Sequence, residues 1–398
     1  MYNHVLIGVW IVMQALIGFN LVFPLILYAL YKISNKNNHT GKEVKEADYA
    51  IIVTAYGQTQ SLFAVVDSLL NLNYKKYLIY IVADNCDISN LHFADNRVVV
   101  LRPAQTLSSN TRSHFYAIKN FKRSHDRLTI IDSDNLADPN YLNALNKCFN
   151  NGFEAVQGIR KAKNLDTTFA CLDAARDIYY HFYDGRLLFG AGSSATLAGS
   201  GMAFSVKLYI DCLKHADITG AGFDKVLQAN IVKRGYRIAF TDEAVVYDEK
   251  TSQPDQLIKQ RSRWINTWFR YFSFGFTIII KGIKNFNLNQ FLFGLVLLRP
   301  PLFIFLILSF SCLISDFWIN EVTSAAWLAG FVFFITGFII ALTHSKTDRR
   351  IYNSLAGIPQ FMFLQVLSLF KARKANVFSI ATTHIHNKTI KELKEGTA

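Results

Sequence analysis

The sequence predicts an α/β domain with a mostly parallel sheet, joined to a helical membrane region. Short apolar runs alternate with helical segments between about residues 46 and 250, and this alternation is typical of parallel strands linked by crossover helices. Three apolar runs of membrane-spanning or near-spanning length lie outside this part, at residues 5–30, 292–314 and 326–342. The composition agrees with a membrane protein, because 51% of the residues are hydrophobic and the mean hydropathy is +0.18.

The first half of the domain contains the clearest strand pattern. Apolar runs predict buried strands, and segments of helical spacing predict helices between them. The expected strands are 49–54, 78–83, 97–101, 128–131 and 155–159, and the expected helices are 61–72, 111–121 and 140–149. Ligands of such sheets bind beyond the carboxyl ends of the strands, which is where Thr54, Asp84, Asp132 and Asp134 fall.

The second half predicts a helix over 165–183, a glycine-hinged turn into a strand at 199–204, and a helix over 223–234. Short strands are expected at 236–240 and 244–247. The aromatic segment 269–280 is followed by two lysines and predicts a helix lying on the membrane surface.

The membrane segments have a consistent charge pattern. The net charge is +13, and the basic residues gather beside the apolar runs, whereas the loop after the second run contains Asp316 and Glu321 and no Lys or Arg. This is the positive-inside pattern, so we expect the soluble domain in the cytoplasm and the protein in the inner membrane, and we expect no nucleic-acid partner. The first run predicts a retained anchor rather than a signal peptide, because it is long and no Lys or Arg precedes it.

These observations divide the chain into five parts. Residues 1–31 are expected to form a transmembrane helix, 46–250 the soluble domain and 291–343 a transmembrane helix pair. Residues 251–290 are expected to hold a helix with the pattern Gln-x-x-Arg-Trp and an interfacial helix, and 344–398 a cytoplasmic or interfacial C-terminal segment. Segment 355–370 predicts an interfacial or re-entrant helix rather than a fourth span, because it is short and basic on both sides.

Two motifs contain residues that could bind a metal ion or a ligand. Asp132 and Asp134 follow an apolar strand as Asp-x-Asp, and alternate residues of a strand share a face, so both carboxylates can hold a Mg²⁺ or Mn²⁺ ion. Gln260, Arg263 and Trp264 stand at positions i, i+3 and i+4, which share one face of a helix. An amide, a guanidinium and an indole that point into one pocket suit a sugar and a diphosphate.

In this order and setting, the two motifs resemble those of family 2 glycosyltransferases with membrane helices, such as cellulose, chitin and hyaluronan synthases. The resemblance covers nearly the whole chain, including the tail segment 381–384. It implies a GT-A domain, a UDP-sugar donor and an inverting, metal-dependent transfer to a growing polysaccharide at the membrane. Membrane lipid is an implied partner, and with three spans the product requires a narrow channel, a homo-oligomer or an export partner.

The resemblance also implies roles for further residues. Thr54, Tyr56, Asp84 and Asp132 would contact the nucleotide-sugar, and Arg112 would lie near its phosphates. Asp224 would be the general base. The acceptor and diphosphate would meet Gly199, Ser200, Gln260, Arg263 and Trp264. A helix cap is the alternative role for Asp84 and for Asp224.

The chain departs from the family pattern at two places. It has Gly57-Gln58 where the family has Asn-Glu, and Gly222-Phe223-Asp224 where the family has Thr-Glu-Asp. Two alternatives therefore stay open beside a polysaccharide synthase. One is a nonprocessive enzyme that glycosylates a lipid, and the other is an inactive membrane-anchored assembly subunit with a transferase fold.

Overall fold

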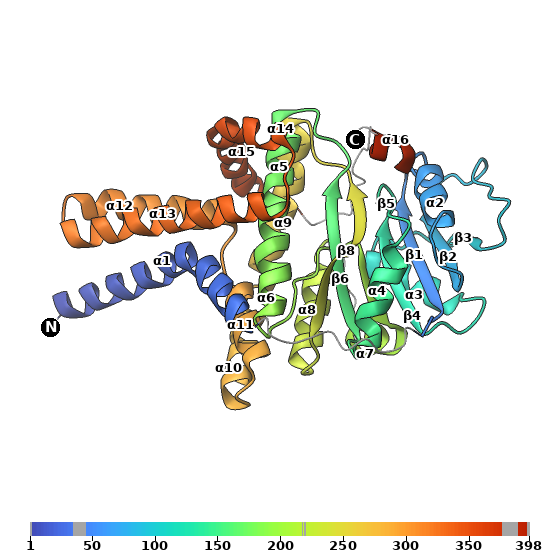
Figure 1. Ribbon diagram of the computed structural model, residues 1–398, viewed down its shortest axis with the longest axis horizontal. Coiled ribbons are helices and arrows are strands. Elements are labelled where there is room, and N and C mark those ends of the chain that lie inside the picture. Colours follow the sequence, from blue (N-terminus) through green and yellow to red (C-terminus); the bar gives the residue numbers. More distant parts are fainter. Residues whose placement is uncertain (1, 35–44, 217, 219, 376–388, 396–398) are drawn as a thin grey trace.

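The structure is a computed structural model that describes residues 2–34, 45–216, 218, 220–375 and 389–395. The tail segment 381–384, on which part of the resemblance depends, lies outside the described residues. A mixed sheet with helices on both faces forms one end of the molecule, and long apolar helices extend from the other end (Figure 1). The predicted α/β domain and helical membrane region are both present.

The sheet has eight strands in the order β3-β2-β1-β4-β7-β6-β8-β5. Strands β3, β2, β1 and β4 are parallel, as are β6 and β8, whereas β7 runs antiparallel between β4 and β6, and β5 runs antiparallel to β8. The predicted mostly parallel sheet is confirmed. The strands are β1 Tyr49–Tyr56, β2 Tyr77–Asp84, β3 Val98–Leu101, β4 Arg127–Asp132, β5 Leu136–Ala137, β6 Ala155–Ala162, β7 Met202–Ser205 and β8 Ile238–Asp248.

Strand β8 replaces the two short strands predicted at 236–240 and 244–247. It stays continuous because the register with β6 shifts at Gly158, between Gln157 and Ile159. A Cβ atom on Gly158 would lie 2.3 Å from the carbonyl oxygen of Ala244, so only glycine fits where the chains approach this closely.

The soluble domain has a π-helical segment that begins at the end of its longest predicted helix. The segment 165–183 was expected to be one α-helix, but α5 ends at Tyr180 and a π-helix, η1, follows. The helices of this domain are α2 Leu62–Leu70, α3 Asn110–Lys119, α4 Tyr141–Asn150, α5 Thr168–Tyr180, η1 His181–Leu187, α6 Leu188–Gly190, α7 Val206–Leu213, α8 Phe223–Lys233 and α9 Pro254–Tyr271. Such π-helical turns often occur at functional sites.

The remaining helices are α1 Tyr2–Ser34, α10 Phe274–Lys284, α11 Leu288–Leu298, α12 Leu302–Phe317, α13 Glu321–His344, α14 Arg349–Ser354, η2 Leu355–Gly357, α15 Ile358–Lys371, η3 Ala372–Lys374 and α16 Ile390–Glu395. By length and composition, Val5–Ser34, Glu321–His344 and Arg349–Lys371 could each cross a membrane. Segment Arg349–Lys371 has the lowest mean hydropathy of the three, 1.2, and its α15 packs along α9 of the soluble domain. Whether it crosses the membrane or lies at the interface, as predicted, is untested.

The apolar run 292–314, which was predicted to belong to a transmembrane helix pair, is not one straight helix, and whether the bent pair crosses the membrane is untested. The helix breaks at Arg299, and α11 and α12 meet at an angle of 74°. Two prolines, Pro300 and Pro301, cause the break, because a residue before proline is driven out of the helical conformation and proline has no backbone N–H. Arg299 accordingly has an extended backbone, with φ −61° and ψ 123°.

Helices α1, α12 and α13 extend away from the sheet in one direction, whereas α10 runs across that direction (Figure 1). Helix α1 bends in its second half, where it contains Pro24. A polar contact joins all three long helices, because the Asp316 carboxylate accepts hydrogen bonds from Gln14 at 2.9 Å and from the Trp327 indole at 3.1 Å. This contact fixes how the three helices face one another.

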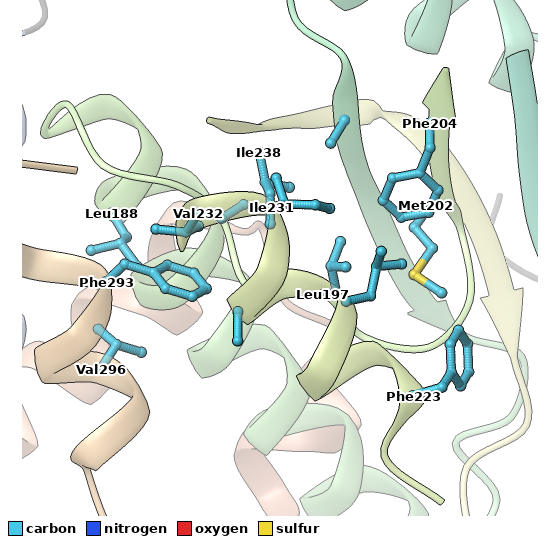
Figure 2. Close-up of a cluster of buried hydrophobic side chains, with 14 of the residues drawn as sticks. Leu188, Leu197, Met202, Phe204, Phe223, Ile231, Val232, Ile238, Phe293 and Val296 are labelled. Carbon is cyan, nitrogen blue, oxygen red and sulfur yellow. The ribbon is translucent and has the colours of Figure 1, made fainter. Parts of the chain in front are cut away.

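A continuous apolar cluster connects the sheet to the helices that adjoin the membrane segments. Figure 2 shows Phe293 and Val296 of α11 near Leu188 and Val232, with Met202 and Phe204 of β7 at the opposite side of the cluster. Phe293, Val232 and Leu188 are fully buried. The cluster therefore holds α11, and with it the α11–α12 break, in a fixed place relative to the strand ends.

Candidate active site

A cavity of about 600 Å³ lies beyond the carboxyl ends of β1 and β4 and is closed by α8, η1, α9 and the α11–α12 break. It brings together residues that are far apart in the sequence. Most of the predicted site residues line it, namely Thr54, Tyr56, Asp132, Asp134, Gly199, Asp224, Gln260, Arg263 and Trp264. Asp84, Arg112 and Ser200 do not line it.

The buried side chain of Ser200 supports the Asp-x-Asp turn through hydrogen bonds. Its hydroxyl accepts the backbone N–H of Asp132 at 3.1 Å and the side-chain amide of Asn135 at 2.7 Å. Ser200 is fully buried, whereas its neighbour Gly199 lines the cavity with a φ of +87°. Ser200 thus positions the carboxylate turn, and in this structure it does not face the space where an acceptor would bind.

The carboxylates of Asp132 and Asp134 fit a divalent cation. Both line the cavity at the end of β4, and no group of three or more His, Cys, Asp or Glu residues that could hold a metal occurs in the described part of the chain. Mg²⁺ and similar ions are commonly held by one or two protein carboxylates and complete their coordination with substrate phosphates and water. Asp132 and Asp134 would be the two protein ligands in that pattern, and the nucleotide would supply others.

Asp84 shapes a loop beside the cavity. Its carboxylate is buried and accepts the backbone N–H groups of Leu107 and Ser108 at 2.9 and 2.8 Å. The Ser108 hydroxyl lies 3.4 Å from the hydroxyl of Tyr56, which does line the cavity. Asp84 does not cap a helix in this structure; it fixes the loop next to the predicted nucleotide contact.

Arg112 lies in the first turn of α3, outside the cavity. Its backbone N–H donates to Ser109, the N-cap of that helix, and its guanidinium donates to the carbonyl of Leu107 at 3.4 Å. The cavity is reached from this helix by Asn110 instead. A direct contact between Arg112 and phosphate therefore requires the guanidinium to turn toward the cavity.

Asp224 is in the first turn of α8 and lines the cavity. The Lys225 ammonium lies 3.1 Å from its carboxylate and also donates to the carbonyl of Leu197 at 2.9 Å. Gly222 precedes the helix with a φ of +109°, and a Cβ atom there would lie 2.6 Å from the ring of Tyr271 in α9. The glycine thus permits α8 to approach α9, which brings Asp224 close to the helix that carries Trp264.

Helix α9 presents Gln260, Arg263 and Trp264 to the cavity, as the spacing predicted. The Gln260 side-chain oxygen accepts a hydrogen bond from the Thr251 hydroxyl at 3.2 Å, which fixes the orientation of its amide. Burial lowers the pKa of the Arg263 guanidinium from its usual value. Arg263 nevertheless remains a cation at neutral pH.

Two arginines that sequence reasoning missed lie against Trp264. The guanidinium carbons of Arg176 and Arg261 are 4.3 and 4.1 Å from the centre of the Trp264 ring, within cation–π range. Asp173 of α5 pairs with Arg261 and, at 3.1 Å, with Arg176. The Asp173 carboxylate therefore fixes the two guanidinium groups, and these in turn fix the position of the Trp264 ring.

A second set of buried charges borders this arrangement. Lys250 lies 2.5 Å from Asp177 and 2.7 Å from Asp248, and Arg160 lies 3.4 and 3.6 Å from the same two carboxylates. Burial raises the pKa of Asp177, but the attraction of Lys250, Arg176 and Arg160 outweighs it and holds that pKa well below the usual value. These paired side chains form a rigid polar wall, because none of them can move without leaving a buried partner without its contact.

His181, the first residue of η1, lines the same wall. Burial lowers its pKa to about 3, and the neighbouring Asp177 offsets only part of this effect. The imidazole is therefore neutral at physiological pH and does not serve as a proton donor there. Asp184, three residues on, pairs with Arg299 at the α11–α12 break. This pair connects the π-helix to the membrane-side end of the cavity.

Comparison with known proteins identifies the family. Residues 47–267 match the model of the glycosyltransferase-like family 2, and this is more than half of the 398 residues. The chain belongs to this family. No curated protein sequence matches this glycosyltransferase.

The solved structures that are similar to the glycosyltransferase include a mannosyltransferase and a part of TarS. A mannosyltransferase from Pyrobaculum calidifontis, in complex with GDP-mannose and Mn²⁺, superposes with a TM-score of 0.58 at 15% identity, over 91% of this chain and 97% of that chain. Residues 1–349 of TarS from S. aureus give a TM-score of 0.39 at 14% identity, over 83% of this chain and 90% of that chain. The first likeness shows the fold, which is GT-A-like as expected, and the second is too distant to support an argument.

Proposed function

We propose that the protein transfers a sugar from a UDP-sugar to an acceptor at the membrane, with inversion at the anomeric carbon. The observation that carries this proposal is that one cavity brings together Asp132, Asp134, Asp224 and Trp264 from three separate elements. These groups match the three needs of the reaction, which are neutralising a diphosphate, taking a proton from the acceptor and aligning the acceptor.

The residues of the chain divide this work. Thr54 and Tyr56 at the end of β1 would hold the uridine, and Asp132 would hold the ribose or share the metal with Asp134. A bound Mg²⁺ or Mn²⁺ would supply Lewis acidity to the leaving diphosphate. The mannosyltransferase of similar fold contains Mn²⁺, which supports the use of a divalent ion by this fold.

On the acceptor side, Asp224 would accept the proton of the attacking hydroxyl. Arg263 would pair with the diphosphate, and Trp264 would offer its ring to the acceptor. No protein acid is needed for the leaving group when a metal ion stabilises it, which agrees with the neutral state of His181.

An inactive assembly subunit is the rival proposal, and the departures at Gly57-Gln58 and Gly222-Phe223 motivated it. The lining of the cavity favours an active enzyme over this rival. At each departure a polar side chain still lines the cavity, Gln58 at the first and Asp224 at the second, and Gly222 lets α8 approach α9. The resemblance to polysaccharide synthases predicts a growing chain as acceptor. A lipid acceptor remains the alternative within the same reaction class.

A direct test uses the purified full chain in detergent with Mn²⁺ and a panel of radiolabelled UDP- and GDP-sugars. We expect one UDP-sugar to be hydrolysed or transferred, and UDP binding measured by calorimetry to depend on Mn²⁺. No turnover of any donor, together with UDP binding that ignores the metal, would leave only the inactive subunit.

The membrane orientation is also a proposal. We infer from the charge pattern that the catalytic domain is cytoplasmic, in the inner membrane, with the α12–α13 turn outside. A cysteine at Asn320 in this turn should react with an impermeant reagent on intact cells, whereas a cysteine at Lys346 after α13 should not. Labelling at Lys346 alone would reverse the orientation.

A further inference from the structure

Helix α8 carries the proposed base in its first turn, yet it begins without a side-chain cap. Its N-cap residue is Gly222, which has no side chain that could accept a backbone N–H of the first turn. Ser, Thr, Asp or Asn commonly takes this role and fixes the start of a helix. Contacts from other elements must therefore hold the first turn of α8, and Asp224 with it, in place.

Helix α3 supplies one such contact through Ser109. The Ser109 hydroxyl donates a hydrogen bond of 2.7 Å to the carbonyl of Ile218, in the segment that leads to α8. Both residues are buried. The same hydroxyl accepts the backbone N–H of Arg112 and so caps α3. One side chain therefore ties the start of α3 to a segment that lies 109 residues further along the chain.

His114 of the same helix supplies a second contact. Its ring meets that of Phe223, the first residue of α8, edge to face, with 5.0 Å between the ring centres and an angle of 67°. This arrangement is favourable for aromatic rings. His114 is fully buried, and its Nδ1 atom lies 2.7 Å from the Tyr209 hydroxyl, which fixes the plane of the imidazole. Phe223 lies at one edge of the apolar cluster in Figure 2, so α3 and the cluster together hold the residue directly before Asp224.

The start of α3 is in turn fixed at the sheet. The buried carboxylate of Asp84, at the end of β2, accepts the backbone N–H groups of Leu107 and Ser108, which directly precede Ser109. A chain of contacts therefore leads from the end of β2 through α3 to the start of α8. None of its hydrogen bonds involves a group that a substrate must also bind.

We propose that Ser109 is a positioning residue for Asp224, and that α3 is the support that sets where the base stands in the cavity. This rests on the proposed glycosyl transfer, in which Asp224 takes the proton of the attacking hydroxyl. Ser109 does not line the cavity, so it acts through the Ile218 carbonyl and does not touch a substrate. A displacement of about 1 Å at a reacting group can lower a rate about 10²-fold, so the loss of this contact is measurable.

The test is Ser109→Ala in the purified full chain in detergent, with the nucleotide-sugar and acceptor that the wild type uses. We expect kcat for transfer to fall about ten- to hundredfold. UDP-sugar affinity in calorimetry should stay unchanged, because Asp84 still holds the backbone at 107–108. Ser109→Thr keeps the hydroxyl and should restore the rate. Ser205→Ala is the matched control, because Ser205 also caps a helix, α7, which does not line the cavity, and it should keep the wild-type kcat.

A second background separates positioning from a general loss of structure. Asp224→Asn has no base to position, so adding Ser109→Ala to it should not lower the residual transfer further. Phe223→Leu removes the ring that meets His114 and should behave as Ser109→Ala does in both backgrounds. This variant also tests the support if Ser109→Ala does not fold.

A wild-type kcat in Ser109→Ala and Phe223→Leu, a loss that Ser109→Thr does not restore, or an equal loss with and without the Asp224 carboxylate would overturn the positioning role. Each of these results would leave the glycosyltransferase intact. Absence of any nucleotide-sugar turnover in the wild type would overturn the proposed function and this inference with it.

Discussion

Asp173 is predicted to stabilise both the fold and the position of Trp264, and Asp173→Asn tests this. The substitution keeps the size of the side chain and removes its charge. It leaves Arg261 without its carboxylate, and the side chain of Arg261 is 3% exposed. Burial already lowers the pKa of Arg261 to about 10, so its charged form has little solvation to replace the lost partner.

The size of the effect follows from the contacts. Removing one partner of a buried ion pair costs about 3–5 kcal/mol, because the other charge stays buried and unpaired. Arg176 also pairs with Asp177 at 3.2 Å, so it keeps a partner when Asp173 is changed. We therefore expect Asp173→Asn to lower the free energy of unfolding by about 3 kcal/mol, at the lower end of this range.

The measurement is denaturant unfolding of the full chain in detergent, combined with acceptor kinetics. The double variant Asp173→Leu with Arg261→Met removes both charges and should return to within about 1 kcal/mol of the wild type, because an apolar pair can replace a buried ion pair. The single variant should raise the acceptor KM and leave UDP affinity unchanged. A single variant as stable as the wild type, or a double variant no better than the single, would refute the reasoning.

Three further predictions concern single side chains. Asp134→Ala should weaken Mn²⁺-dependent UDP binding at least about tenfold in calorimetry, roughly 1.4 kcal/mol, and unchanged affinity would remove Asp134 from the metal site. Asp224→Asn should keep UDP-sugar binding and lower transfer by about 10²–10⁴-fold, since Asn caps a helix nearly as well as Asp but cannot take the proton; normal product formation would exclude Asp224 as the base. Burial lowers the pKa of His114 to about 3, so at pH 5 the unfolded chain takes up a proton that the folded protein does not. His114 alone should therefore lower the free energy of unfolding by about 2 kcal/mol between pH 7 and pH 5, and His114→Gln should lose this contribution to the pH dependence.

The sequence predicted those parts of the fold that local patterns encode. Parallel buried strands are short apolar runs, so β1, β2 and β4 were found close to their observed bounds. The antiparallel direction of β7 was not predicted, because a strand's direction depends on its neighbours and not on its own residues. The π-helix η1 was missed for a related reason, since one extra residue in a turn hardly changes the apolar period.

The candidate site was predicted where one element supplies several residues, and missed where distant elements meet. Gln260, Arg263 and Trp264 share a helix, so their spacing alone placed them on one face. Arg261 and Asp173 are 88 residues apart, and no local pattern marks such a pair. A charge within an apolar stretch is a usable signal, and Arg299, directly before two prolines in an otherwise apolar run, could have revealed the α11–α12 break.

The α11–α12 break determines which part of the chain closes the cavity on the side of the apolar helices. A continuous helix over 292–314 would direct the whole apolar run into the bilayer and leave the cavity without its far wall. Instead, Pro300 and Pro301 turn the chain, and the pair between Arg299 and Asp184 fixes the turn against the π-helix. The lining of the cavity includes the carboxylates of Asp132 and Asp134 and, at the break, the aliphatic side chains of Leu297 and Leu302. The break therefore gives one cavity both charged and apolar walls.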